Sequence, residues 1–300
     1  MEGKRDAHKN HKPMNGEREP LREYERRVAH AWLFDIDGVL TDPLEKKVTQ
    51  PAVLAEIYRR LLAGEPVALN TGRSSEFITN RVLKELEKMI LDKQLLQGLC
   101  AIGEKGALSI VYDEKGARHE MIDESISIPK VLQDAVRMLV EEQFADVMFY
   151  DTTKKTMVTA EMNEGVRMDI FKQRQEELNR ELERLLVKHG LEGSYTIDST
   201  RIATDIQHKN AGKALGADRF LQWLKWKGLA PEQVVAFGDS RSDVDMAEEV
   251  HKSGLPVEFV FVGDRALLQD KQFSFEITFT HGQFEEGVLE YLQEHPSEQE

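Results

Sequence analysis

Clusters of polar residues stand directly after short apolar runs at three places in the sequence. Asp35 and Asp37 follow the run at 31–34 and are two residues apart. Two carboxylates a few ångströms apart are unfavourable as a pair of anions unless a cation lies between them. Mg²⁺ meets that requirement because it prefers carboxylate and carbonyl oxygens. An Asp-x-Asp-Gly sequence alone is more typical of a turn, so the metal interpretation depends on the other clusters.

The second and third clusters supply groups that suit an oxyanion and a metal. Thr71 offers a hydroxyl, and Gly72 offers a backbone N–H that a ligand can approach closely. Ser74 is placed to cap a helix, whose N-terminus favours a phosphate group. After a later apolar run, Asp239 and Asp243 add two carboxylates. Because phosphoryl groups need both donors and cations, the three clusters complement one another.

A positively charged side chain is the remaining requirement, and two lysines can supply it. Lys209 and Lys213 lie just before or at the start of a predicted helix. A lysine there would neutralise a phosphoryl oxygen and a nucleophilic carboxylate together, although each lysine alone is more typical of solvated surface. The segment is not a Walker A loop, because the leading glycine is missing and Ala214 replaces Ser or Thr. Spacing alone leaves the choice between the two lysines open.

Alternating strands and helices predict the scaffold that positions these residues. Apolar runs predict buried strands, and apolar residues at helical spacing predict the helices between them. The expected strands are 31–34, 67–69, 234–237, 257–262 and 275–279, and the expected helices are 51–62, one from Ser74 to about Ile90, 213–227 and 284–293. In a doubly wound sheet, ligands bind at the carboxyl ends of the strands. We therefore expect a mostly parallel, Rossmann-like α/β core in which the clusters converge.

The middle of the chain has a different pattern, which predicts an insertion. Its expected elements are strands at 107–112 and 118–122, a helix from Pro129, a hairpin at 147–160, a helix at 166–189 that Gly190 ends, and a hairpin at 195–206. The order helix then hairpin occurs twice, which is typical of a small antiparallel α+β layer. The expected domains are a core formed by 29–104 and 206–300, an inserted α+β domain at 105–205, and a charged tail at 1–28.

Composition limits the function classes. The 300 residues carry 40 Lys and Arg against 54 Asp and Glu, a formal net charge of −14, which disfavours binding to nucleic acid or anionic membranes. Cys100 is the only cysteine, so it has no partner for an internal disulfide. We expect no membrane span and no secretory signal, because no apolar run of the required length occurs. The expected protein is soluble and cytoplasmic, with a solvated tail.

The motifs, in this order, resemble those of the haloacid dehalogenase-like (HAD) phosphohydrolases. The matching segments are 35–41 for the first motif, 71–73 for the second, 211–215 for the third and 238–246 for the fourth. The third motif requires a lysine, for which Lys213 is the better match and Lys209 the alternative. The resemblance covers about residues 29–300.

The position of the insertion, between the second and third motifs, resembles Cof-type and sucrose-phosphatase-like members, which carry an α+β cap there. Residues 104–107 resemble the Glu-Asn-Gly-Ala segment that leads into such caps. Three positions depart from the family pattern: Ser242 and Asp264 stand where Asn is common, and Ala214 where Gly is common. None of the three changes removes a carboxylate of the motifs, so we expect activity to be retained.

The resemblance implies a Mg²⁺-dependent phosphatase that works through an aspartyl-phosphate. Asp35 would attack phosphorus, and Asp37 would act first as an acid and then as a base. The implied Mg²⁺ ligands are the carboxylates of Asp35, Asp239 and Asp243 and the backbone carbonyl of Asp37. The implied phosphate donors are Thr71, the Gly72 N–H and Lys213.

The insertion would exclude water and contact the leaving group. Lys154, Arg201 and Lys209 are candidates for that contact, although each is more typical of ordinary surface charge. The resemblance favours a small phosphorylated metabolite, above all a sugar phosphate. A phosphomutase or phosphotransferase with the same nucleophile remains an alternative, and so does a non-catalytic sensor of a phosphorylated ligand. A sensor has no need of the second carboxylate of the Asp35–Asp37 pair, and a dehalogenase would not need Asp37 or the metal carboxylates.

Overall fold

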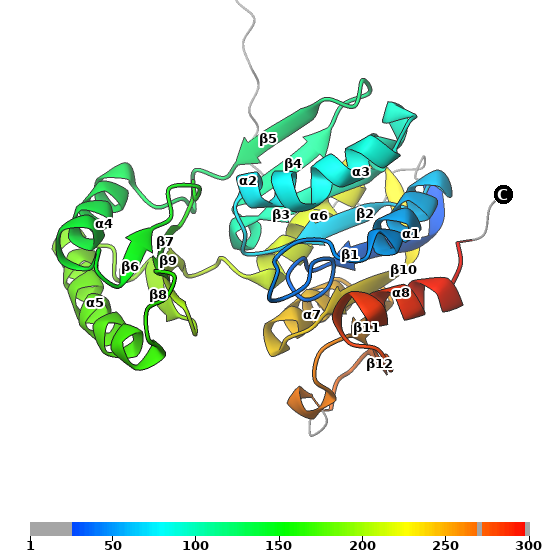
Figure 1. The fold of residues 1–300 in the computed structure, drawn as a ribbon. Coiled ribbons are helices and arrows are strands. Elements are labelled where there is room, and N and C mark those ends of the chain that lie inside the picture. The colour runs from blue at the N-terminus through cyan, green and yellow to red at the C-terminus, as the bar shows by residue number, and fades with distance from the viewer. Residues whose placement is uncertain (1–25, 269–271, 298–300) are drawn as a thin grey trace, which may run out of the picture.

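The computed structural model describes residues 26–268 and 272–297, and its central feature is an eight-stranded sheet (Figure 1). The strand order is β12-β11-β10-β1-β2-β3-β4-β5. Strands from β12 to β3 run parallel, whereas β4 and β5 run antiparallel to their neighbours. The bounds are β1 (Arg26–Phe34), β2 (Val67–Asn70), β3 (Leu99–Gly103), β4 (Leu108–Tyr112), β5 (Arg118–Ile122), β10 (Leu229–Gly238), β11 (Val257–Phe261) and β12 (Glu276–Phe279). The predicted mostly parallel α/β core is confirmed.

Helices cover both faces of this sheet (Figure 1). One face carries α1 (Pro51–Leu62), α2 (Ser75–Ile78), α3 (Lys84–Met89) and α8 (Phe284–Glu294). The other face carries α6 (Lys213–Lys227) and α7 (Val244–Lys252). A π-helical turn at 79–83 joins α2 to α3, so the predicted helix after Ser74 is one segment with a local change of pitch. The helices thus bury both faces of the sheet and leave the site residues at its carboxyl edge.

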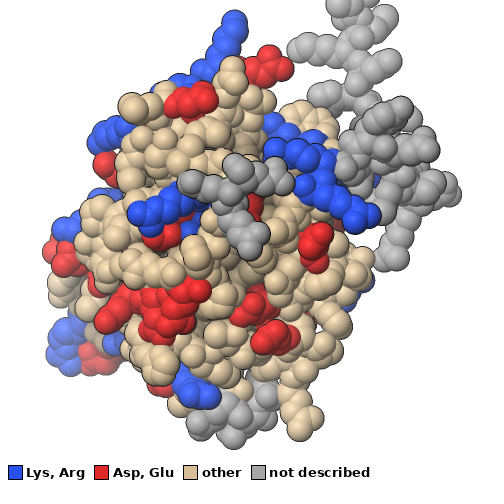
Figure 2. Space-filling model, turned by 90° about the vertical axis from the view of Figure 1, so that its right-hand side faces the viewer, with Lys and Arg blue, Asp and Glu red and all other residues tan. Residues whose placement is uncertain are grey.

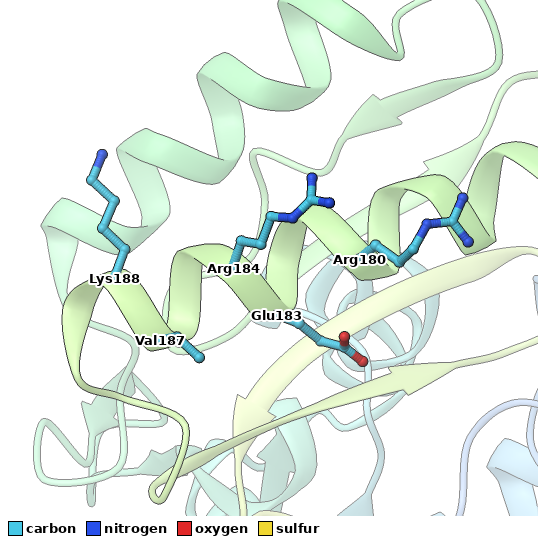
Figure 3. A pocket seen from close by; sticks show the side chains of 5 residues that line it. All are labelled: Arg180, Glu183, Arg184, Val187 and Lys188. Atoms are coloured by element: carbon cyan, nitrogen blue, oxygen red, sulfur yellow. The ribbon is translucent and has the colours of Figure 1, made fainter.

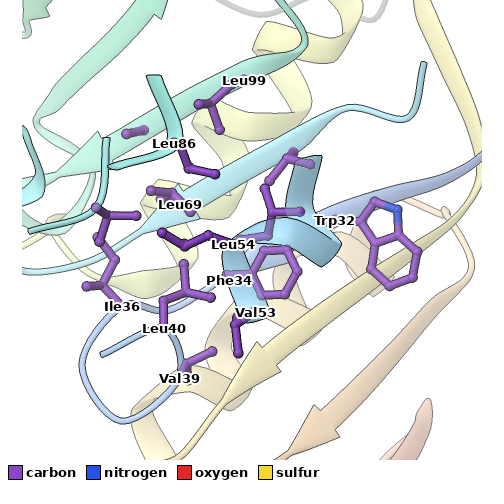
Figure 4. Packing of buried hydrophobic residues seen from close by; sticks show 14 of the residues in the cluster. Trp32, Phe34, Ile36, Val39, Leu40, Val53, Leu54, Leu69, Leu86 and Leu99 are labelled. Atoms are coloured by element: carbon purple, nitrogen blue, oxygen red, sulfur yellow. The ribbon is translucent and has the colours of Figure 1, made fainter. Parts of the chain in front are cut away.

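Buried aromatic and aliphatic side chains fix the central strands. Trp32 and Phe34 of β1 lie in the core with Leu54 of α1 and Leu69 of β2 (Figure 4). The rings of Phe34 and Phe237 stack with their centroids 4.6 Å apart, which ties β1 to β10. Burying a side chain of this size stabilises the fold by about 1.5–3 kcal/mol. The strands that end in the polar clusters are therefore buried and packed against one another in the core.

A second, four-stranded antiparallel sheet lies beside the core, in the order β6-β7-β9-β8. Its elements are α4 (Lys130–Gln143), β6 (Met148–Tyr150), β7 (Val158–Met162), α5 (Met168–His189), β8 (Tyr195–Ser199) and β9 (Ala203–His208). We call residues 130–208 the cap. Figure 1 shows α4 and α5 on the side of this sheet away from the core. The helix α5 ends at Gly190, whose φ of 66° is left-handed and favours glycine.

The strands at 108–122 belong to the large sheet, which differs from the sequence analysis. Residues 105–205 were expected to form the inserted domain, but β4 pairs with β3 and β5 with β4. The turn at 104–106 reverses the chain so tightly that Leu108 pairs directly with Gly103. A hairpin pattern looks the same in either sheet, and the sequence alone does not show which sheet it extends. The cap therefore follows β5.

The surface carries both signs of charge. Figure 2 shows the side that lies to the right in Figure 1, where acidic and basic side chains are interspersed over the described residues.

Among the described residues, no helix has the length and apolar character that crossing a membrane requires. The predicted tail at 1–28 lies outside the described residues except for 26–28, which begin β1.

Candidate active site

The polar clusters do meet at one edge of the large sheet. Asp35 follows β1, Thr71 follows β2 and Asp239 follows β10, and these three strands are adjacent and parallel. One carboxylate oxygen from each of Asp35, Asp239 and Asp243 lies within 4.8 Å of the other two. Asp35 is thus brought beside Asp239 and Asp243, about 200 residues later in the sequence, as the strand ends predict.

Asp243 is buried and held by the loop that precedes α7. Its Oδ2 accepts hydrogen bonds from the Ser240 hydroxyl at 2.7 Å and from the backbone N–H groups of Ser240 and Asp239 at 3.0 and 3.2 Å. Ser242, at the position where the resemblance leads us to expect Asn, has its hydroxyl 3.0 Å from that of Ser240. With Ser242 in place, Asp243 Oδ2 thus has three hydrogen bonds, and its Oδ1 lies 2.6 Å from Lys213 Nζ.

Lys213 is the cation of the site. It is the first residue of α6, and its Nζ lies 2.6 Å from Asp35 Oδ1 and 2.6 Å from Asp243 Oδ1. Burial by itself would lower the pKa of Lys213, but Asp243 and Asp35 raise it above the ordinary value, so the ammonium stays charged. Lys209, the alternative, donates instead to the Gly193 carbonyl at 2.9 Å on the exposed part of the cap. Geometry thus favours Lys213 as the third-motif lysine.

The carboxylates carry more negative charge than Lys213 offsets. Burial raises the pKa of Asp35 well above its usual range in spite of Lys213. Burial and the neighbouring Asp243 raise the pKa of Asp239 to about 7. Gly38, with φ +70°, lets Asp239 approach, since a Cβ there would lie 2.2 Å from Asp239 Oδ2. An oxygen-rich cluster whose acids resist ionisation fits a hard divalent cation.

Asp37 has a partner that the sequence analysis missed. Arg73 Nε donates to Asp37 Oδ2 at 2.8 Å and Arg73 Nη2 donates to Asp37 Oδ1 at 3.0 Å, a two-pronged pair. The guanidinium also lies 4.7 Å from the centre of the Phe77 ring and 3.8 Å from Glu161 of the cap. Burial lowers the pKa of Arg73 but Asp37 raises it further, so the charge persists. The signal was present in Thr71–Gly72–Arg73, where only the first two residues were given roles.

The predicted phosphate-binding residues lie at the end of β2. Thr71 is buried, and its Oγ1 accepts a hydrogen bond from the Arg73 N–H at 3.2 Å. Ser74 caps α2 as predicted, with its hydroxyl accepting from the Phe77 N–H at 3.3 Å. Because β2 adjoins β1, the loop at 71–74 lies at the same sheet edge as Asp35.

The loop between β6 and β7 brings the cap onto the core. Lys154 Nζ donates to the Gly72 carbonyl at 2.5 Å, and burial lowers the pKa of Lys154. The hydroxyls of Thr153 and Ser74 are 2.9 Å apart. Of the three cap residues predicted to contact substrate, Lys154 is therefore at the cap–core interface. Arg201 is exposed in the turn between β8 and β9, and Lys209, one residue after the cap, donates to Gly193 of the cap.

Glu104 and Lys105, where the chain leaves β3, make further cap contacts. The Glu104 carboxylate accepts from the Lys155 N–H and from both the N–H and the hydroxyl of Thr156, at 2.7–3.0 Å. Lys105 Nζ lies 3.0 Å from Asp198 and 3.2 Å from Asp205 on the cap sheet. Both linker residues adopt positive φ, 47° and 58°. The sheet face that carries these acids is thus turned toward the core.

A shallow groove lies elsewhere, on the exposed side of α5. Its volume is about 540 Å³, and its lining residues, Arg180, Glu183, Arg184, Val187 and Lys188, all belong to this helix (Figure 3). None of the residues of the carboxylate cluster lines it. The candidate site is therefore identified from its side chains and not from this groove.

Comparison with known proteins agrees with the motifs. A family model described as haloacid dehalogenase-like hydrolase matches residues 166–254. Among curated proteins, none matches the chain. The resemblance to that family is confirmed at this level, and the Cof-type subdivision stays a prediction.

Solved structures share the fold at low identity. The C-terminal domain of trehalose-6-phosphate phosphatase from C. albicans is similar with a TM-score of 0.60 and 15% identity, covering 88% of this chain and 91% of that one. A haloacid dehalogenase-like hydrolase from Bacteroides thetaiotaomicron has a TM-score of 0.62 and 13% identity, covering 89% and 99%. Trehalose-6-phosphate phosphatase from Aspergillus fumigatus has a TM-score of 0.51 and 19% identity, and the match covers 89% of this chain and 92% of that one. At these identities the likeness establishes the fold.

Proposed function

We propose, on the premise of a haloacid dehalogenase-like fold and family match, that this chain is a Mg²⁺-dependent phosphatase of a small phosphorylated metabolite. The observation that carries the proposal is the position of Lys213 Nζ, 2.6 Å from both Asp35 and Asp243, beside the carboxylate of Asp239. A nucleophile, a cation and metal-binding oxygens meet at one sheet edge. Phosphoryl transfer depends mainly on such positioning and charge neutralisation.

In the proposed reaction, Asp35 is the nucleophile. Its carboxylate oxygen attacks phosphorus while the bond to the leaving oxygen breaks, and Asp37 gives that oxygen a proton. Asp37 then removes a proton from water, whose oxygen attacks the same phosphorus and releases phosphate and free Asp35. Thr71, the Gly72 N–H and Lys213 donate to the phosphoryl oxygens throughout.

The residues present fit a divalent cation, as the raised pKa values of Asp35 and Asp239 indicate. The carboxylates of Asp35, Asp239 and Asp243 and the backbone carbonyl of Asp37 would hold Mg²⁺, which supplies positive charge against the phosphoryl oxygens. The contribution of the chain is to keep these oxygens together before substrate arrives.

Asp37 needs one oxygen free for proton transfer. Arg73 contacts both oxygens of Asp37, so one of the two hydrogen bonds has to open during the reaction. Arg73 also lies near Glu161 on the cap, which offers the guanidinium another acidic partner.

We further propose that the leaving group is a polyhydroxylated compound, as in a sugar phosphate. The cap face turned toward the core carries Glu161, Asp198, Asp205 and Gln207, whose oxygens accept hydrogen bonds from hydroxyl groups. Lys154 and Lys105 add donors at the same interface. Two of the similar structures above are trehalose-6-phosphate phosphatases, whose substrate has this chemistry.

Phosphate release by the purified chain tests the proposal. We expect release from p-nitrophenyl phosphate and from members of a sugar-phosphate panel with Mg²⁺, and loss of release with EDTA or in Asp35→Asn. The matched control is Asp134→Asn, an exposed residue of α4, which should keep wild-type rates.

Two results would replace the proposal. Transfer of phosphate to a sugar acceptor in preference to water would favour a phosphomutase or phosphotransferase. Absence of Mg²⁺-dependent release from every compound, with retained binding of a phosphorylated ligand, would favour a non-catalytic sensor.

A further inference from the structure

We propose that Asn70 is a positioning residue for Lys213, an inference that rests on the role given to Lys213 in the proposed function. Asn70 is the last residue of β2 and is fully buried. Its side-chain Nδ2 donates to the Lys213 backbone carbonyl, and its Oδ1 has no hydrogen-bond partner among the described residues. No feature of the sequence singles Asn70 out.

The two residues bond reciprocally. Asn70 Nδ2 donates to the Lys213 backbone carbonyl at 2.9 Å, and Lys213 Nζ donates to the Asn70 backbone carbonyl at 3.0 Å. The first bond fixes where α6 begins relative to β2. The second bond places the Lys213 ammonium at the carboxyl end of β2. Together they bind both the backbone and the ammonium of Lys213, whose Nζ lies 2.6 Å from Asp35 and from Asp243.

Gly216 makes room for this arrangement. A Cβ on Gly216 would lie 1.9 Å from Asn70 Oδ1, 2.4 Å from Asn70 Cγ and 2.6 Å from Asn70 Nδ2, and these three are its nearest neighbours. Gly216 is in the first turn of α6, where glycine is a poor helix former. Its presence is explained if the Asn70 amide must pack directly against the helix backbone.

A purely structural role for Asn70 is the competing interpretation. In that case its loss would lower the melting temperature without changing how Lys213 behaves. A positioning role instead predicts a more mobile Lys213 ammonium and slower chemistry, because small displacements of a catalytic group are costly.

The test compares wild type, Asn70→Ala, Gly216→Ala and the double variant. Each protein is treated with acetic anhydride, and acetylation of Lys213 is followed by mass spectrometry, together with kcat and KM for p-nitrophenyl phosphate. In each single variant we expect Lys213 to be acetylated at least about fivefold faster than in the wild type. We expect kcat to fall about tenfold and KM to stay within about threefold of the wild-type value. Asn210→Ala, an exposed residue near Lys213, is the matched control and should behave as wild type.

The double variant gives the sharpest result. Once Asn70 is truncated, the methyl group at position 216 has space, so the double variant should be no worse than Asn70→Ala alone. Multiplicative losses in kcat, or Lys213 acetylation unchanged by Asn70→Ala, would overturn the proposal. If Asn70→Ala does not fold, Asn70→Ser replaces it.

The two proposals fail separately. If the wild type releases no phosphate, the proposed function fails, while the acetylation rates still decide whether Asn70 positions Lys213. If the wild type is active and acetylation does not change, the positioning role alone fails.

Discussion

Asp35, Lys213 and Asp243 form a buried row of alternating charge in which each member depends on the others. The Lys213 ammonium offsets two carboxylates, and burial magnifies the effect of removing it. The sequence identified all three residues through their places at strand and helix ends. It favoured Lys213 over Lys209 only through the resemblance of the third motif, because the contacts that distinguish them, Lys213 with the carboxylates and Lys209 with the Gly193 carbonyl, depend on tertiary structure.

Lys213→Met should abolish measurable turnover or lower it by about 10²–10³-fold, since a preorganised cation is lost. It should also destabilise the protein by about 3–5 kcal/mol, because two buried carboxylates lose their partner. Denaturant unfolding and steady-state kinetics measure the two effects. Lys209→Met is the matched control, and loss of activity there with activity retained in Lys213→Met would show that the third-motif lysine is Lys209.

The raised pKa of Asp239 predicts a pH dependence for the proposed Mg²⁺ site. With a pKa of about 7 in the metal-free protein, Asp239 holds a proton below pH 7, and Mg²⁺ must displace that proton to bind. Mg²⁺ affinity, measured by calorimetry, should therefore fall by up to about tenfold per pH unit between pH 7 and pH 5. Above pH 8 it should be level. A constant affinity across this range would contradict the burial of Asp239.

At the scale of elements, the sheet edge and the loop at 151–157 have different structural roles. The parallel strands place the charged row, and the β6–β7 loop closes on the loop at 71–74 through Lys154 and Thr153. Strand ends and helix caps could be predicted from apolar runs, Ser74 and Gly190. The sheet to which β4 and β5 belong could not, since it depends on the positive φ of Glu104 and Lys105, residues that rarely adopt it.

Glu104→Ala should loosen the β6–β7 loop. The backbone N–H groups of Lys155 and Thr156 lose their acceptor, so their hydrogen exchange should accelerate by about tenfold or more. The amide of Leu178, in the middle of α5, should not change. Glu120→Gln, which removes only an exposed ion pair with Lys155, is the control. Equal exchange in wild type and Glu104→Ala would show that another contact holds the loop.

At the scale of the whole molecule, the cap and the core meet across a polar interface. Core residues Arg73 and Lys105 face cap acids, and cap residue Lys154 faces the core carbonyl of Gly72. The order of the motifs predicted that an inserted layer lies over the site, but the pairs across the interface follow from tertiary structure. Arg201 is an example, because the sequence does not show whether a basic residue in a hairpin lies at the cap–core interface or on the exposed surface.

Lys154→Met should discriminate between substrates. For the best sugar phosphate of the panel, kcat/KM should fall by about 10-fold or more, since a donor at the leaving-group side is lost. For p-nitrophenyl phosphate, whose leaving group has no hydroxyl groups to bind, the fall should be under about threefold. Arg201→Met should leave both values unchanged. A uniform loss with both substrates would assign Lys154 to the cap–core contact alone.

The central claim is that Asp35 carries the phosphoryl group during turnover. Enzyme that is turning over substrate with Mg²⁺ is quenched with borohydride, which reduces an aspartyl-phosphate to homoserine, and its peptides are sequenced by mass spectrometry. We predict homoserine at position 35, absent without substrate and absent in Asp35→Asn. Turnover with homoserine at another position, or with no reduced residue at all, would contradict the account.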